Sequence, residues 1–194
     1  PSETRLLLQA LPHFAARHPD LPVRLYSRHR RPERSLGGGD IALELGNPDA
    51  ASIGFESLGS YRVVTCASPA YLAERGLPTS IDALSAHRSI PAARDEIGDV
   101  RPLRFRDGEA TRDVVLEHVV AASDVGTQLA AALAGLGITQ LPLTREVRGQ
   151  LAQRRLVPIL EAYEPDAVPI LLGHGADMPP AFDEFRAWLT DLYR

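Results

Sequence analysis

Hydrophobic residues in this chain recur at two spacings, one typical of helices and the other typical of strands. Near the beginning, apolar residues recur at helical spacing over residues 7–15. Ser2 or Thr4 precedes this run and can cap a helix, and Pro12 interrupts it, so we expect a kink or a restarted first turn there. Pro19 ends the helix, because a proline disfavours helical geometry in the residue before it.

The remaining elements follow from apolar runs bounded by turn residues. Strands are expected over 23–27, 40–45, 61–67, 88–90, 138–141, 156–160 and 168–172, and a hairpin over 103–106 and 111–116. Helices are expected over 32–36, 69–75, 80–84, 124–134, 142–153 and from 179 to near the C-terminus. Strands and helices alternate for most of the chain, which predicts an α/β fold with largely parallel pairing.

Composition narrows the class of protein. The chain has 194 residues, 44% of them hydrophobic and 24% charged, as in an ordinary soluble globular protein. A net charge of −4 provides no electrostatic footprint for binding nucleic acid. The single cysteine, Cys66, excludes an internal disulfide and suits a reducing cytoplasm, where we expect the protein to be located. We find neither an apolar run near the ~20 residues of a membrane span nor a signal peptide.

Three blocks carry a family resemblance, and they lie at residues 40–46, 66–72 and 131–138. In this order and spacing they resemble the effector-binding half of LysR-type transcription regulators. Residues 11–20 and 82–90 are similar to further parts of that family. The resemblance implies two Rossmann-like α/β lobes joined by two crossing strands, as in type 2 periplasmic binding proteins, with the ligand in the cleft between the lobes. One lobe would comprise residues 1–65 and 168–194, and the other residues 66–167.

The beginning of the chain suggests a longer parent protein. The sequence lacks an initiating Met and a strand feeding its first helix. The winged helix-turn-helix of the family is also absent, so we expect contact with DNA only through an N-terminal domain of the parent. By resemblance, the expected partners are a small effector and a second copy of the chain, with a tetramer in the parent and no contact with a membrane.

Two helix starts are the main candidates for the effector site. A helix start presents unpaired N–H groups and a partial positive charge, which suit a carboxylate or phosphate. Ser2 and Thr4 lie at one such start, and Ser123 and Asp124 lie at the other. The alternative is that these residues only cap their helices. The carboxylates of Glu3 and Asp124 would repel an anionic ligand if they point inward.

Four other residues are candidates for the same site by resemblance. Gly46 would let the backbone approach a ligand, and its alternative role is that of a turn glycine. Ser68 would contact ligand from the second lobe, or it only caps the helix beginning at Pro69. Ile90 and Pro91 fall where the family has a variable pocket wall, with core and loop as the alternative.

Catalytic and metal chemistry have little support in the sequence. Cys66 lies in an apolar strand and is expected to be an inert core thiol. His87 and His118 show no metal-ligand spacing with it and are expected to be structural or surface residues. The chain has no Gly-x-Ser-x-Gly elbow, so we expect no enzyme, no metal and no cofactor.

Three functional classes therefore remain. The favoured one is the sensing domain of a transcription regulator that binds a small carboxylate or aromatic effector. A free-standing solute-binding protein for transport and an enzyme on the same fold are the alternatives. We expect a homodimer in which the first helix and residues 23–27 meet the partner's helix 124–134, with Ala131 on the contacting face.

Overall fold

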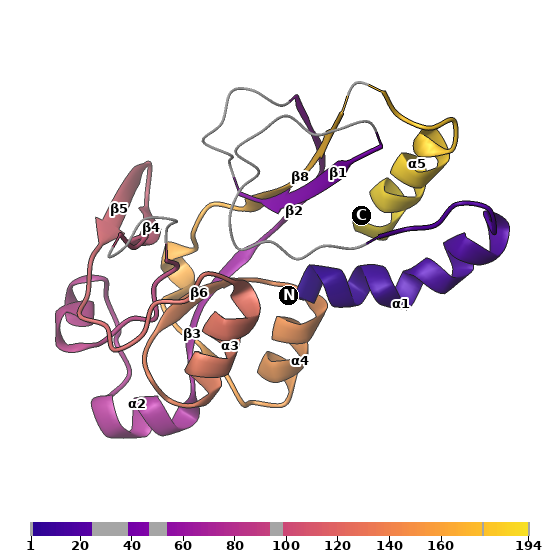
Figure 1. Ribbon diagram of the computed structural model, residues 1–194. Coiled ribbons are helices and arrows are strands. Elements are labelled where there is room, and N and C mark those ends of the chain that lie inside the picture. Colours follow the sequence, from indigo (N-terminus) through magenta and orange to yellow (C-terminus); the bar gives the residue numbers. More distant parts are fainter. Residues whose placement is uncertain (1, 25–38, 47–53, 94–98, 176, 194) are drawn as a thin grey trace. The chain divides into compact units, whose positions relative to one another are not determined.

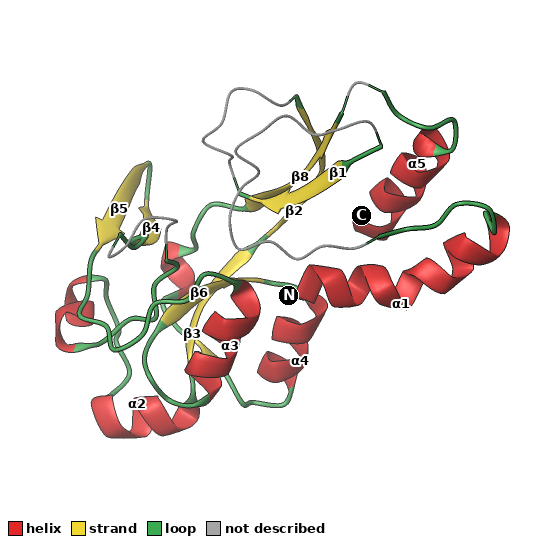
Figure 2. Cartoon of the chain, viewed as in Figure 1, coloured by secondary structure: helices red, strands yellow, loops and turns green. Residues whose placement is uncertain are grey.

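A computed structural model describes residues 2–24, 39–46, 54–93, 99–175 and 177–193. Figure 1 traces the chain and labels most of its helices and strands, and Figure 2 colours them by type. The chain divides into two compact units. Unit 1 comprises residues 1–2 and 62–167, and unit 2 comprises residues 3–61 and 168–194.

Unit 2 contains a three-stranded sheet with the order β1–β8–β2. Its strands are β1 (Ile41–Leu45), β2 (Phe55–Tyr61) and β8 (Val168–His174). Two helices, α1 (Ser2–Arg17) and α5 (Phe182–Tyr193), share one apolar core with the sheet. Phe14 of α1 meets Phe185 of α5 edge to face, with ring centroids 5.2 Å apart.

Unit 1 is built around a sheet with the order β6–β3–β7. The strands are β3 (Val63–Ala67), β6 (Thr139–Pro142) and β7 (Val157–Pro158), and β4 (Leu103–Asp107) with β5 (Ala110–Val114) forms a separate hairpin. Its helices are α2 (Pro69–Arg75), η1 (Asp82–Ala86), α3 (Val125–Leu133), α4 (Arg145–Ala152) and η2 (Glu161–Tyr163). Ser89 bridges to His118 on one side and to Ile138 on the other, which adds an irregular strand beside β6.

The prediction of largely parallel pairing is wrong for the described strands. Every pair of named strands in both sheets and in the hairpin is antiparallel, and only isolated bridges such as those of Ser89 are parallel. The reason is that the middle strand of each sheet is the one by which the chain enters the unit. β3 follows directly after unit 2, β8 follows directly after unit 1, and each runs against both of its neighbours.

Most elements expected from the sequence are confirmed, with shifts at their ends. α2 and the β4–β5 hairpin match the prediction closely. α1 does not restart at Pro12, because residues on both sides of the proline pack into the same core. α4 begins at Arg145 rather than at Pro142, because the Thr144 hydroxyl accepts a hydrogen bond from the Val147 N–H and caps the helix there.

Four further expectations need correction or fall outside the described residues. The strand expected over 61–67 is two strands, β2 and β3, separated by Arg62. The strand expected over 40–45 is β1, and it is only partly buried along its length. Residues 23 and 24 have no regular structure, whereas the rest of the strand expected over 23–27 and the helix over 32–36 lie outside the described residues. No described helix is both long and apolar enough to cross a membrane.

Candidate functional site

Asp124, and not Ser123, caps the start of α3. The Asp124 carboxylate accepts hydrogen bonds from the Thr127 N–H at 3.0 Å and from the Thr127 hydroxyl at 2.7 Å. Burial by itself raises the pKa of Asp124, but the hydrogen bonds from Thr127 and Gly126 outweigh it and hold the pKa below its usual value. The start of α3 therefore already carries a negative charge supplied by the protein itself.

Four of the candidate residues come together beside this helix start. The Pro91 carbonyl accepts a hydrogen bond from the Ala122 N–H at 3.0 Å, so Ile90 and Pro91 run alongside the residues that lead into Ser123 and Asp124. Pro91 is buried, and Ile90 is 0% exposed in the core shared by α3, β3 and β6. The core alternative is thus confirmed for the Ile90 side chain, whereas Ser123 is exposed.

A buried polar network behind α3 was not foreseen from the sequence. The Ile90 carbonyl accepts hydrogen bonds from the Thr139 hydroxyl at 3.0 Å and from the Gln128 side-chain amide at 3.3 Å. The same amide lies 3.4 Å from the Thr139 hydroxyl. Gln128 stands one turn after Asp124 on a helix face that is otherwise apolar, and this is the signal that could have identified it. The network fastens the Ile90–Pro91 backbone to α3.

Ser68 lies away from the other candidates of unit 1. Its hydroxyl accepts a hydrogen bond from the Tyr71 N–H at 3.3 Å and caps α2, so the capping role is confirmed. A Cβ atom at Gly135, just beyond the end of α3, would lie 3.6 Å from the Ser68 hydroxyl. Nine helical residues separate that end from Asp124, and they span about 13 Å. Ser68 is therefore next to the end of α3 opposite the start at Asp124.

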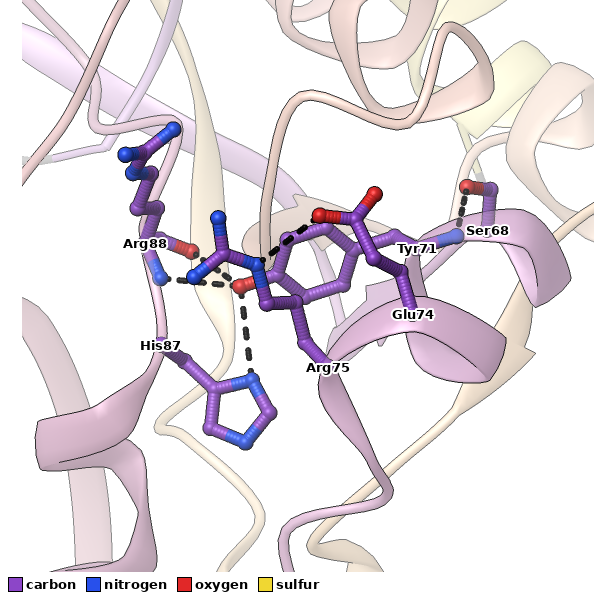
Figure 3. Close-up of polar contacts among 6 residues, drawn as sticks. All are labelled: Ser68, Tyr71, Glu74, Arg75, His87 and Arg88. Atoms are coloured by element: carbon purple, nitrogen blue, oxygen red, sulfur yellow. Dashed lines mark hydrogen bonds and ion pairs between the residues drawn. The ribbon is translucent and has the colours of Figure 1, made fainter.

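Tyr71 of α2 forms a polar contact with His87 (Figure 3). The Tyr71 hydroxyl lies 3.3 Å from Nδ1 of His87 and accepts a hydrogen bond from the Arg88 N–H at 2.8 Å. Burial, followed by the charge of Arg75, lowers the pKa of His87 below its ordinary value of 6.5. The structural role expected for His87 is confirmed, since it joins η1 to α2.

The candidates on β1 and α1 are less completely described. Gly46 ends β1 with φ +90°, a conformation that favours glycine, and its N–H donates to the Pro169 carbonyl at 2.9 Å. The turn-glycine alternative therefore accounts for it. α1 begins at Ser2, so Thr4 lies within its first turn rather than ahead of it. The side chains of Ser2 and Thr4 are not among those that the structure describes.

Cys66 is confirmed as a core thiol. It is 0% exposed at the centre of β3, and burial raises the pKa of its thiol to about 12. Ala131 departs from its predicted place on an outward face, because it is only 9% exposed and packs in the same core as Cys66. In the described part of the chain, no group of three or more His, Cys, Asp or Glu side chains could hold a metal ion.

Comparison with known sequences identifies relatives along the whole chain. The family model described as the LysR substrate binding domain matches residues 1–194. The HTH-type transcriptional regulator YhjC of Escherichia coli K12 is 30% identical over 194 residues, covering 97% of this chain and 64% of that protein. The chain thus spans less than two thirds of the length of this relative.

Two solved structures with the same fold come from regulatory proteins. The full-length Vibrio cholerae virulence activator AphB, described as a member of the LTTR family, superposes with a TM-score of 0.78 at 19% identity, over 98% of this chain and 64% of that one. The regulatory domain of CrgA from Neisseria meningitidis superposes with a TM-score of 0.75 at 24% identity, over 96% and 91%. At these identities the likeness concerns the fold, and it confirms the predicted type 2 periplasmic-binding-protein-like class.

Proposed function

Because the chain belongs to the LysR substrate binding domain family, we propose that it is the ligand-sensing part of a DNA-binding transcription regulator. The observation that carries this proposal is the family match over all 194 residues. The relatives found are transcriptional regulators. The sequence also left open a transport protein and an enzyme, and neither class is represented among these relatives. The role in this proposal is regulatory rather than catalytic, and its place is the cytoplasm, where a regulator meets DNA.

The effector in this proposal is a small carboxylate or aromatic acid held at the start of α1. Both helix starts offer N–H groups and a partial positive charge. At α3 the Asp124 carboxylate already accepts the hydrogen bonds of Thr127, so a second carboxylate there would meet a like charge. The start of α1, with the hydroxyls of Ser2 and Thr4, is the better place for the anionic group of the effector.

The proposed mechanism is a population shift. An effector that binds one conformation of the chain more tightly than another moves the equilibrium toward it by the difference in affinity. In an assembled regulator, that shift changes the arrangement of the subunits and hence of their DNA-binding domains. The isolated chain, with a net charge of −4, would bind effector but not duplex DNA.

The effector proposal is tested by a thermal-shift screen of the chain against small aliphatic and aromatic carboxylates, followed by titration calorimetry of the best acid. Replacing Ser2 and Thr4 together by alanine should weaken binding by about 1 kcal/mol for each lost hydrogen bond. The matched control replaces Ser85 and Thr111, two exposed residues of unit 1, and should bind as the parent does. Equal affinity in the two double variants would remove the α1 start from the site.

A second variant tests the electrostatic argument at α3. Asparagine caps a helix as well as aspartate does, so Asp124→Asn removes the charge and keeps the cap. If the effector carboxylate lies near α3, its affinity should rise in this variant. If it binds at α1 and away from Asp124, its affinity should stay unchanged while the Ser2 and Thr4 variant still weakens it.

The proposed homodimer uses the outward face of α3. Ala131 is buried, so the exposed alanines available for close approach are Ala130 and Ala134. Ala130→Arg should give a folded monomer in light scattering, whereas the unmodified chain should be dimeric. A dimeric Ala130→Arg variant would exclude this surface as the interface.

A further inference from the structure

Beyond the start of α1, the chain passes between the two units at two places. The outward connection is the Tyr61–Arg62 link, and the return connection ends at the Ala167–Val168 link. In unit 2 these connections are held together by strand pairing, because Tyr61 lies opposite Val168 in the β2–β8 ladder. What holds the same two connections in unit 1 is a set of side chains.

An arginine and a glutamate join the outward and return connections in unit 1. Nε of Arg62 donates to one carboxylate oxygen of Glu164 at 2.6 Å, and its terminal nitrogen donates to the other oxygen at 2.7 Å. The two residues are 102 positions apart in sequence. This two-bond geometry is the strongest form of an arginine–carboxylate pair, and it orients both groups.

A second arginine holds the return connection two residues further on. Nε of Arg106, on β4, donates to Asp166 at 2.7 Å. Pro165 lies between Glu164 and Asp166, and its ring fixes one of the backbone angles of the segment. Residues 164–166 are thus paired at both ends and stiffened in the middle, whereas Ala167 is exposed.

The two arginines that pair with these carboxylates are held within unit 1 by backbone and core contacts. The Arg62 carbonyl accepts a hydrogen bond from the Leu143 N–H at 2.8 Å, which ties it to the end of β6. Arg106 follows Phe105, which is fully buried, and Glu164 follows Tyr163, which packs on the same core as Phe105. The two arginines therefore extend from backbone that is held within unit 1.

We propose that Arg62 and Arg106 fasten the return connection, residues 164–167, to unit 1 and thereby confine the hinge of the molecule to the links Tyr61–Arg62 and Ala167–Val168. With the pairs in place, only a few backbone angles at these two links are free to change. Without them, residues 164–167 would join the flexible part of the hinge, so the units could adopt a wider range of arrangements. The pairs set where the molecule bends and how far.

Exposed ion pairs contribute little to stability in general. Restricting the freedom of one connecting segment requires only a modest attraction between pre-positioned groups. The pKa values support the pairing of Arg62 with Glu164, since the hydrogen bond between them raises the pKa of the arginine and lowers that of the glutamate. Because both groups are exposed, salt should weaken the attraction.

Single-molecule energy transfer on the whole chain tests the proposal without any effector. Dyes are attached to cysteines introduced at Asp20 in unit 2 and Gln153 in unit 1, both exposed, while the buried Cys66 stays unlabelled. Combining Glu164→Gln with Asp166→Asn should broaden or displace the distribution of transfer efficiency. About 1 M NaCl should have the same effect on the parent chain and little further effect on the double variant.

Two more variants decide how the result is interpreted. Asp113→Asn breaks a pair of the same kind, because Arg104 donates to Asp113 at 2.8 and 3.0 Å within the hairpin, and it should leave the distribution unchanged. Exchanging the two charges, with Arg62→Glu and Glu164→Arg, keeps an ion pair at this place. This variant should therefore give a narrow distribution of transfer efficiency. A double variant indistinguishable from the parent, or an equal effect of Asp113→Asn, would overturn the proposal. Neither outcome bears on effector binding, so the proposed function would stand or fall separately.

Discussion

Replacing Thr139 by valine should reveal how strongly the buried network behind α3 holds the Ile90–Pro91 backbone. Thr139 is 0% exposed, and valine keeps its shape while removing the hydroxyl. The change removes the 3.0 Å hydrogen bond to the Ile90 carbonyl and leaves the Gln128 amide with one partner fewer. Loss of a buried hydrogen bond costs about 1–3 kcal/mol. The added methyl group offsets about 0.8 kcal/mol, so we expect a net loss of about 0.2–2 kcal/mol.

The assay is urea unfolding followed by circular dichroism, with Thr111→Val as the matched control. Thr111 is exposed on β5, so the same chemical change there should alter the free energy of unfolding by less than about 0.5 kcal/mol. Gln128→Leu should also destabilise the chain. The double variant should show a coupling of about 0.5–3 kcal/mol, because both side chains donate to the Ile90 carbonyl.

A Thr139→Val variant as stable as Thr111→Val would show that the hydroxyl contributes nothing to the fold. Strictly additive effects of the Thr139 and Gln128 changes would show that the two side chains act separately, and the network would then have no role in positioning the backbone beside α3.

Four further predictions rest on other parts of unit 1. Gly137→Ala places a Cβ atom 2.7 Å from the Arg88 carbonyl oxygen, so it should destabilise the chain by about 1–3 kcal/mol in the same unfolding assay. Gly149→Ala adds a Cβ atom on α4 that meets nothing within 4 Å, so it should stabilise the chain by about 0.5–1 kcal/mol. A Gly137→Ala variant more stable than Gly149→Ala would contradict both predictions. Since the folded-state pKa of His87 lies below 6.5, the unfolded chain binds more protons as pH falls from 7 to 5. Stability should therefore fall over that range, and it should fall less in His87→Gln, as pH-dependent thermal unfolding can check. Cys66, with its thiol pKa raised to about 12, should not react with a chromogenic disulfide reagent at pH 8 until urea unfolds the chain, and prompt reaction of the native protein would refute its burial.

The sequence alone determined the elements whose signals are local. The proline, serine and glycine around α2 mark both of its ends within nine residues, and the Asp107–Gly108 turn marks the β4–β5 hairpin. The ordered blocks also identified the family and the fold class, because each block preserves the pattern of one short element and their spacing preserves the connections. Cys66 could be assigned to the core from the apolar character of its strand.

Only the tertiary structure decided the relations between distant segments. β8 inserts between β1 and β2 after more than a hundred intervening residues, and no local pattern encodes the direction in which it pairs. Likewise, Gln128 and Thr139 share the Ile90 carbonyl, and Arg62 pairs with Glu164, only because the fold brings these residues together. Periodicity reports which face of one element is apolar, whereas pairing direction and polar contacts depend on which elements the folded chain brings together.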